Sequence, residues 1–265
     1  GSYLLILFLT ILSVLKKNIL KAVICSVALS ILSFILFSEK QLEVIDSENL
    51  FNIPEGNNNF TYLTYSPGED NHREEYKNPD IISYSIDASK ILDAKWNQSK
   101  IKWRERYWGF DKEKLPLNGR LWIPEGDKKF PLISIIHGNH SMQEHSDDGY
   151  NYLGEYLSEH GYIFNSLDQN FLNGSWTGDF RGKEMTTRAW HFLENLNYLK
   201  KLNNDSSSIL YNKIDFNNII VMGHSRGGEA VNIASKFNEL KTFPDNGNVD
   251  LDYNFNIKGI VTLAP

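Results

Sequence analysis

The feature that most constrains this sequence is a serine between glycines that directly follows a short apolar run. Residues 219–222 are Ile-Ile-Val-Met, and the next six are Gly-His-Ser-Arg-Gly-Gly, with Ser225 at the centre of a G-x-S-x-G pattern. Apolar residues then recur at helical spacing over residues 230–240. A strand, a sharp turn with this pattern and a helix together expose a nucleophilic serine at the carboxyl edge of a parallel sheet.

The geometry of such a turn restricts its residue types. A chain that reverses so sharply leaves no room for a side chain at Gly223 or Gly227, and it pushes the hydroxyl of Ser225 away from the backbone. The N-terminus of the following helix favours negative charge that develops beside the serine. The pattern therefore predicts a catalytic Ser225, with His224 only a part of the turn because its ring should point away from the adjacent hydroxyl. The alternative is an ordinary glycine-rich turn that contains a serine.

Short apolar runs and segments with helical spacing alternate along the rest of the chain. The first strands alternate apolar and polar residues, as half-buried antiparallel strands do, whereas the later strands are continuous apolar runs. This order predicts an α/β fold, with a mostly parallel sheet, antiparallel N-terminal strands and helices on both faces. The predicted strands cover 60–65, 81–86, 119–123, 132–136, 162–167, 219–222 and 257–263, and the predicted helices cover 150–160, 185–202 and 230–240.

A second motif supports the catalytic interpretation. The sequence His-Gly-Asn-His at 137–140 follows the apolar run 132–136. In α/β-hydrolases the loop at this place supplies one backbone N–H of the oxyanion hole, and the residue after the nucleophile supplies the other. Here these donors are Asn139, with His140 as an alternative, and Arg226. Each donor is worth about 3 kcal/mol at the transition state.

Polar and aromatic residues that follow other strands are candidates for a substrate pocket. Asp168 ends a strand at the same edge, where it could pair with Arg226 or Arg188 or make local hydrogen bonds in its loop. Aromatic residues of the long loop 170–182 could line an acyl or aromatic pocket or pack against the loop itself. The candidate pocket residues are His137, whose side chain is also expected to hold its own loop, His140, Asp168 and Trp176.

No metal or cofactor site is expected. His137, His140 and His145 are close in sequence, but a zinc site needs three or four ligands on fixed elements with further hydrogen-bonding support, so a loop that carries histidines for other reasons is favoured. The single cysteine excludes an internal disulfide framework and a multi-cysteine metal site. Glu184 and Arg188 are spaced as neighbours on a helix, which predicts a solvated salt bridge.

Five stretches carry a resemblance to a known family: Tyr-Trp-Gly-Phe at 107–110, Leu-Pro-Leu-Asn-Gly-Arg at 115–120, His-Gly-Asn-His at 137–140, Asp-Gln-Asn-Phe-Leu-Asn-Gly-Ser-Trp at 168–176, and Gly-His-Ser-Arg-Gly-Gly-Glu-Ala at 223–230. In these the chain resembles the α/β-hydrolase superfamily, in the branch with dienelactone hydrolases, cutinase-like polyesterases and platelet-activating-factor acetylhydrolases. More closely, it resembles uncharacterised membrane-anchored bacterial α/β-hydrolases. The resemblance covers about residues 60–265. It implies a serine ester hydrolase, but it implies no particular substrate.

The rest of a catalytic triad is not found where the superfamily places it. The superfamily's chain order is serine, then Asp or Glu, then histidine, yet all seven histidines precede Ser225. We therefore expect the acid and the histidine to follow residue 265, and we expect the hydrolase fold to be incomplete and inactive without them. The alternative is a catalytically inactive α/β-hydrolase-like module that binds a ligand outside the cytoplasm. A third possibility is transfer of the acyl group to an alcohol.

The N-terminal segment has a different composition from the rest. Residues 19–37 are apolar apart from Lys21 and a few serines, and a shorter apolar run, 3–14, precedes a turn with two lysines. Hydropathy and length predict transmembrane insertion of 1–37, a linker over 38–59 and a hydrolase domain over 60–265. The lysines should remain in the cytoplasm, which places that domain outside it. A formal charge of −6 argues against nucleic-acid binding, and the expected substrate is a small-molecule, lipid or polymer ester.

Overall fold

The computed structural model describes residues 11, 23–24, 26–31, 56–92, 98–175, 180 and 182–265. The chain divides into two compact units, Gly1–Pro54 and Glu55–Pro265. In the first unit the described residues are helical. No helix formed by described residues is both long enough and apolar enough to cross a bilayer. The predicted transmembrane segment 1–37 falls almost entirely outside the described residues, so it stays a prediction.

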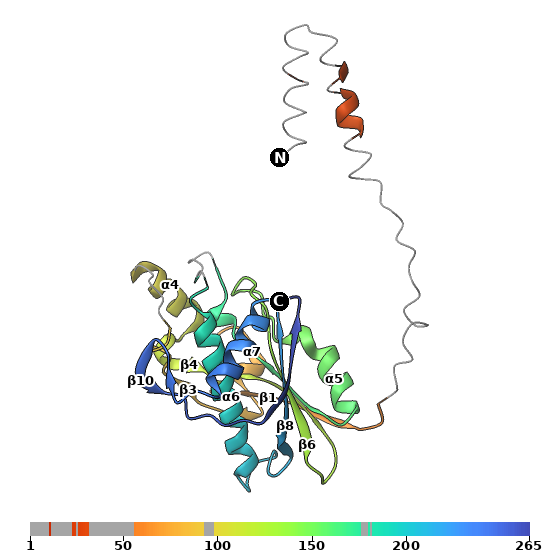
Figure 1. Cartoon of the computed structure of the whole chain (residues 1–265), viewed down its shortest axis with the longest axis vertical. Helices are drawn as coiled ribbons and strands as arrows, with labels where there is room; N and C mark the ends of the chain where they lie inside the picture. The colour runs from red at the N-terminus through yellow and green to blue at the C-terminus, as the bar shows by residue number, and fades with distance from the viewer. Residues whose placement is uncertain are drawn as a thin grey trace. The chain divides into compact units, whose positions relative to one another are not determined.

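A mixed sheet of seven strands forms the centre of the second unit (Figure 1). Strand β5 runs antiparallel to both of its neighbours, and all the other pairs in the sheet are parallel. The predicted α/β architecture with a mostly parallel sheet is therefore confirmed. Across the sheet the order is β11 (Ile257–Leu263), β8 (Ile214–His224), β6 (Phe130–Ile136), β7 (Ile163–Leu167), β5 (Gly119–Pro124), β1 (Phe60–Ser66) and β2 (Ile81–Ile82).

Helices cover both faces of this sheet, as predicted. Helix α5 (Asn151–Glu159) packs through Leu153 and Leu157 on a small apolar cluster of one face. Helices α6 (Met185–Asn204) and α7 (Arg226–Phe237) pack together on the larger core of the other face. Figure 1 shows α5 on one side of the strands and α6 with α7 on the other.

Two parts of the secondary structure differ from the prediction. The predicted strand 81–86 is two short strands, because β2 continues the large sheet in parallel with β1 while β3 (Ser85–Ile86) pairs with β4 (Leu115–Pro116) in a separate sheet. The sequence pattern also gave no sign of α4 (Gln98–Trp108). The remaining short elements are α3 (Glu74–Lys77), η2 (Lys112–Lys114), η3 (Asp148–Tyr150), η4 (Asn170–Leu172), β9 (Thr242–Phe243) and β10 (Asn246–Asp250).

Candidate active site

Ser225 is the single residue between the end of β8 and the start of α7, so the strand–turn–helix arrangement expected from the sequence is present. Its backbone has φ 50° and ψ −123°, a conformation that costs a non-glycine residue on the order of 1–3 kcal/mol and persists only where the surroundings fix it. The N–H of Ser225 donates to the carbonyl oxygen of Leu263 at 2.9 Å, and its own carbonyl oxygen accepts from the N–H of Gly228 at 2.8 Å. Strand β11 and helix α7 thus hold the strained turn from two sides.

The two flanking glycines are required because backbone atoms occupy the space of a side chain. A Cβ on Gly223 would lie 2.1 Å from the carbonyl oxygen of Gly227, and a Cβ on Gly227 would lie 2.1 Å from that of Ile136. Backbone this close cannot move aside as a flexible side chain can. Gly227 therefore lets the start of α7 lie directly against the end of β6.

The loop after β6 meets the serine turn at Gly138. A Cβ on Gly138 would lie 3.1 Å from the Cβ of Ser225, so the predicted oxyanion loop is next to the predicted nucleophile. The side-chain oxygen of Asn139 accepts from the N–H of Gly174 at 3.1 Å, which fixes this loop. Asn139 follows Gly138 in this loop, and Arg226, the first residue of α7, follows Ser225. The N-terminus of a helix favours developing negative charge, so the assignment of their N–H groups as oxyanion donors stays a prediction.

The imidazole of His137 holds this loop, as expected for its side chain, and it is not among the residues that line the cavity beside the serine turn. The side chain is fully buried. Its Nδ1–H donates to the carbonyl oxygen of Gly138 at 2.7 Å, and its Nε2 accepts from the N–H of Gln169 at 2.9 Å. Burial, together with the charge of Arg188, lowers the pKa of His137 to about 4. The ring is therefore a neutral support between two backbone segments.

The buried state of His137 predicts a specific pH dependence of stability. Unfolding restores its ordinary pKa of about 6.5, so the unfolded chain binds an extra proton between pH 6.5 and 4 and the free energy of unfolding falls as the pH falls through that range. We expect His137→Gln to reduce this slope by about 1.4 kcal/mol per pH unit. Urea unfolding measured at several pH values tests this, with the exposed His140→Gln as control. An equal slope in the two variants would contradict the prediction.

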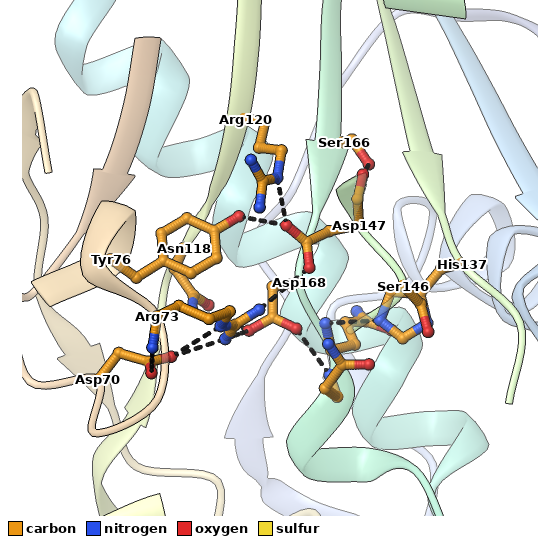
Figure 2. A network of polar contacts seen from close by, with 12 residues as sticks. Asp70, Arg73, Tyr76, Asn118, Arg120, His137, Ser146, Asp147, Ser166 and Asp168 are labelled. Atoms are coloured by element: carbon orange, nitrogen blue, oxygen red, sulfur yellow. Dashed lines mark hydrogen bonds and ion pairs between the residues drawn. The ribbon is translucent and has the colours of Figure 1, made fainter. Parts of the chain in front are cut away.

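Asp168 is also buried, and its partner differs from both arginines suggested by the sequence. Its Oδ2 accepts from Nη2 of Arg73 at 2.5 Å and from Nδ2 of Asn118 at 2.9 Å (Figure 2). Its Oδ1 accepts from the N–H of Asn170 at 2.9 Å. Burial alone would raise the pKa of Asp168, but the charge and hydrogen bond of Arg73 outweigh it and hold the pKa well below its usual range. Asp168 thus connects Arg73, Asn118 and its own loop through hydrogen bonds.

Arg73 is the centre of a buried ionic network that the sequence pattern did not indicate. Besides Asp168, it contacts Asp70 at 2.7 Å and Asp147 at 3.0 Å. Asp147 also accepts from Arg120 at 2.6 Å and from the hydroxyl of Tyr76 at 2.6 Å. The network, shown in Figure 2, ties the segment before α3 to β5 and to the loops that follow β6 and β7.

Glu184 and Arg188 do not form the solvated pair predicted from their spacing, because both side chains are fully buried. Glu184 pairs with the guanidinium of Arg226. Arg188 donates to the side-chain oxygen of Asn173 at 2.5 Å and to that of Gln169 at 3.3 Å. Burial lowers the pKa of Arg188 to about 10. Glu184, which directly precedes α6, therefore contacts the serine turn through its ion pair with Arg226.

A cavity of about 380 Å³ adjoins the serine turn at His224. His140 lines it, and so do residues from the loop between β6 and α5. Trp176 lies outside the described residues. A larger cavity of about 650 Å³, near β9 and the start of α6, includes no residue of the serine turn or of the loop at 137–140. Within the described part of the chain, no group of His, Cys, Asp or Glu side chains is arranged to hold a metal ion.

Three of the described histidines have other partners. Nδ1 of His224 faces the hydroxyl of Tyr150 at 3.1 Å, His137 is held between backbone groups, and Nε2 of His191 lies 2.9 Å from the carbonyl oxygen of Pro116. The geometry thus presents a strained serine to which these three rings contribute no base. Comparisons with protein-family models and with curated proteins gave no match for this chain.

Proposed function

We propose that residues 60–265 form part of an α/β-hydrolase domain that hydrolyses carboxylic esters through Ser225. The observation that carries this proposal is the strained backbone of Ser225, at φ 50° and ψ −123°, between a parallel strand and a helix. Such strain costs free energy, and it is typical of turns that expose a nucleophilic serine. The close approach of Gly138 to the same serine supports the proposal, because it brings a second set of N–H groups to the place where an oxyanion would form.

The reaction has two steps. The Oγ of Ser225 attacks the ester carbonyl while a base takes its proton, and the N–H groups of Asn139 and Arg226 stabilise the tetrahedral oxyanion. The C–O bond to the alcohol then breaks, and the protonated base returns the proton to the leaving oxygen. Water attacks the acyl-enzyme in the same manner and releases the carboxylic acid.

The proposal assigns the base to residues outside the described part of the chain. A general base must lie within hydrogen-bond reach of the serine oxygen, and the rings of His137, His191 and His224 have other partners. In the superfamily's chain order the acid and the histidine follow the serine, so the proposal takes both from there. In this proposal residues 1–37 anchor the domain to a membrane, with the domain outside the cytoplasm, and the ester is a small molecule, a lipid or a polymer.

Covalent labelling tests the nucleophile directly. A fluorophosphonate transfers its phosphonyl group to an activated serine oxygen, with loss of fluoride and of the serine proton. We expect the full-length protein to gain one adduct, which peptide mass spectrometry places on Ser225, and we expect Ser225→Ala to gain none. An adduct on another serine, or equal labelling of the two proteins, would rule out the assignment.

The engagement of His137, His191 and His224 with other groups supports a second candidate, a catalytically inactive binding module. Full-length protein that binds a ligand but neither reacts with a fluorophosphonate nor turns over an ester would favour this candidate. The intact glycines at 223 and 227 favour the hydrolase, because a module without chemistry has no need of a strained serine.

A further inference from the structure

The cavity beside the serine turn has walls from two places in the chain. One wall is the loop and short helix 140–150, and the other is His224, which directly precedes Ser225. The hydroxyl of Tyr150 lies 3.1 Å from Nδ1 of His224 and joins the two walls. A Cβ on Gly138 would lie 3.2 Å from the same Nδ1 and 3.1 Å from the Cβ of Ser225. The wall of the cavity therefore includes His224, the direct neighbour of the proposed nucleophile Ser225.

The residues that line this cavity are polar in type and carry little charge, although carbon atoms make up most of its surface. Its described side chains offer imidazole, phenol, hydroxyl and carboxylate groups, and among them is no aliphatic residue, lysine or arginine. Nε2 of His145 is buried and has no hydrogen-bond partner among the described residues. A buried polar atom without a partner costs about 1–3 kcal/mol, so this nitrogen favours an occupant that can hydrogen-bond. The lining residues are His140, Glu144, His145, Ser146, Gly149, Tyr150 and His224.

This lining discriminates between classes of occupant. An alkyl chain would remove water from the imidazole, phenol and hydroxyl groups without replacing their hydrogen bonds. A phosphate or carboxylate would meet the carboxylate of Glu144 without a lysine or arginine to neutralise it. A neutral group with several hydroxyls can both donate and accept, and its C–H faces can pack on the rings of Tyr150 and His224. A volume of about 380 Å³ is enough for a compact group of this kind.

We infer that this cavity is the subsite for a neutral, hydroxyl-rich part of the ester substrate, such as a sugar ring or a glycerol unit. The inference rests on the proposed function, since it assigns the substrate class of the same site. In it Tyr150 and His145 determine specificity by hydrogen bonding to hydroxyl groups, while Ser225 performs the chemistry.

Binding measured without turnover tests the inference. The protein is full-length Ser225→Ala, and the probes are methyl α-glucopyranoside, glycerol and 1-hexanol, each titrated by ligand-observed NMR. We expect saturable binding of at least one polyol in the millimolar range and none of 1-hexanol. Tyr150→Phe and His145→Gln, made in the same background, should each weaken polyol binding by about fivefold, the loss expected for one hydrogen bond. The matched control is the exposed Tyr211→Phe, which should bind as the parent does.

Three outcomes would overturn the inference: saturable binding of 1-hexanol in preference to the polyols, polyol binding that the cavity variants leave unchanged, and no saturable binding by a folded protein. The conservative Tyr150→Phe keeps the ring, and circular dichroism identifies any variant that fails to fold. The separate labelling experiment distinguishes the two failures. A protein that reacts at Ser225 but binds no polyol disproves only the subsite, whereas one that binds polyols but does not react disproves only the hydrolase.

Discussion

Replacing Ser225 with alanine is expected to lower kcat/KM of the full-length protein for p-nitrophenyl acetate by about 10³-fold or more, because the nucleophile and its base act as a unit. We expect the effect to be specific to the hydroxyl of Ser225. The backbone contacts at Gly223 and Gly227 exclude any residue with a side chain, so no other hydroxyl can replace that of Ser225 in this turn. Alanine keeps the Cβ, and the fold should tolerate it. Initial rates of nitrophenolate release measure the effect.

Ser207→Ala is the matched control for this experiment. Ser207 is exposed, and its hydroxyl donates to Asp205 at 2.7 Å in a turn outside the candidate site. Its kcat/KM should equal that of the parent. Turnover that survives in Ser225→Ala would remove the serine from the mechanism, whereas a parent without turnover, and without labelling by a fluorophosphonate, would favour the binding module.

The part of the fold that could be predicted from the sequence is the part governed by local patterns. Strands buried on both faces are continuous apolar runs, and for this reason the strand 132–136 was predicted within the bounds of the buried strand β6. Helix α4 was missed because its sequence, Gln-Ser-Lys-Ile-Lys-Trp-Arg-Glu-Arg-Tyr-Trp, has no helical spacing of apolar residues. Apolar and polar residues alternate over the segment 81–86, as they do in strands, but alternation does not identify the partner strand. The two halves of the segment pair in different sheets.

The same distinction applies to the candidate site. The serine turn could be predicted because its characteristic pattern lies within six consecutive residues. The partner of Asp168 could not, because Arg73 is 95 positions away and no local pattern joins them. The prediction for Glu184 and Arg188 was wrong for a different reason. Their spacing is typical of exposed ion pairs on a helix, but here both side chains are buried. Sequence patterns thus indicated the nucleophile, while the side chains that support it depend on the tertiary fold.

Arg73→Met should be the most destabilising single change among the supporting residues, with an expected loss of about 3–5 kcal/mol in the free energy of unfolding. Arg73 is paired with Asp70, Asp147 and Asp168, and the exposed fractions of the four side chains are 3%, 3%, 0% and 6%. Methionine has a similar length, so the main loss is the positive charge that compensates buried carboxylates. Urea unfolding at pH 7 measures the difference between parent and variant.

The pH dependence separates this electrostatic effect from a packing defect. In the parent, Arg73 holds the pKa of Asp168 below its usual range, so the stabilisation is present above about pH 4 and is lost only as the pH falls further. In Arg73→Met, burial still raises that pKa while only weaker groups, such as the hydrogen bonds from Asn118 and Asn170, lower it, and protonation relieves the buried charge. The stability difference between parent and variant should therefore shrink from pH 7 to pH 5, and a second change, Asp168→Asn, should restore part of the loss at pH 7.

Lys236→Met is the control for this network, because Lys236 forms an exposed pair with Glu239 at 2.7 Å, and such pairs contribute about 0–1 kcal/mol. If Arg73→Met unfolds at the same urea concentration as Lys236→Met, the network does not stabilise the fold. A loss that does not change with pH would indicate a packing defect. A loss that shrinks toward pH 5 would show that a cation before α3 stabilises the loops after β6 and β7, the first of which includes the proposed oxyanion loop.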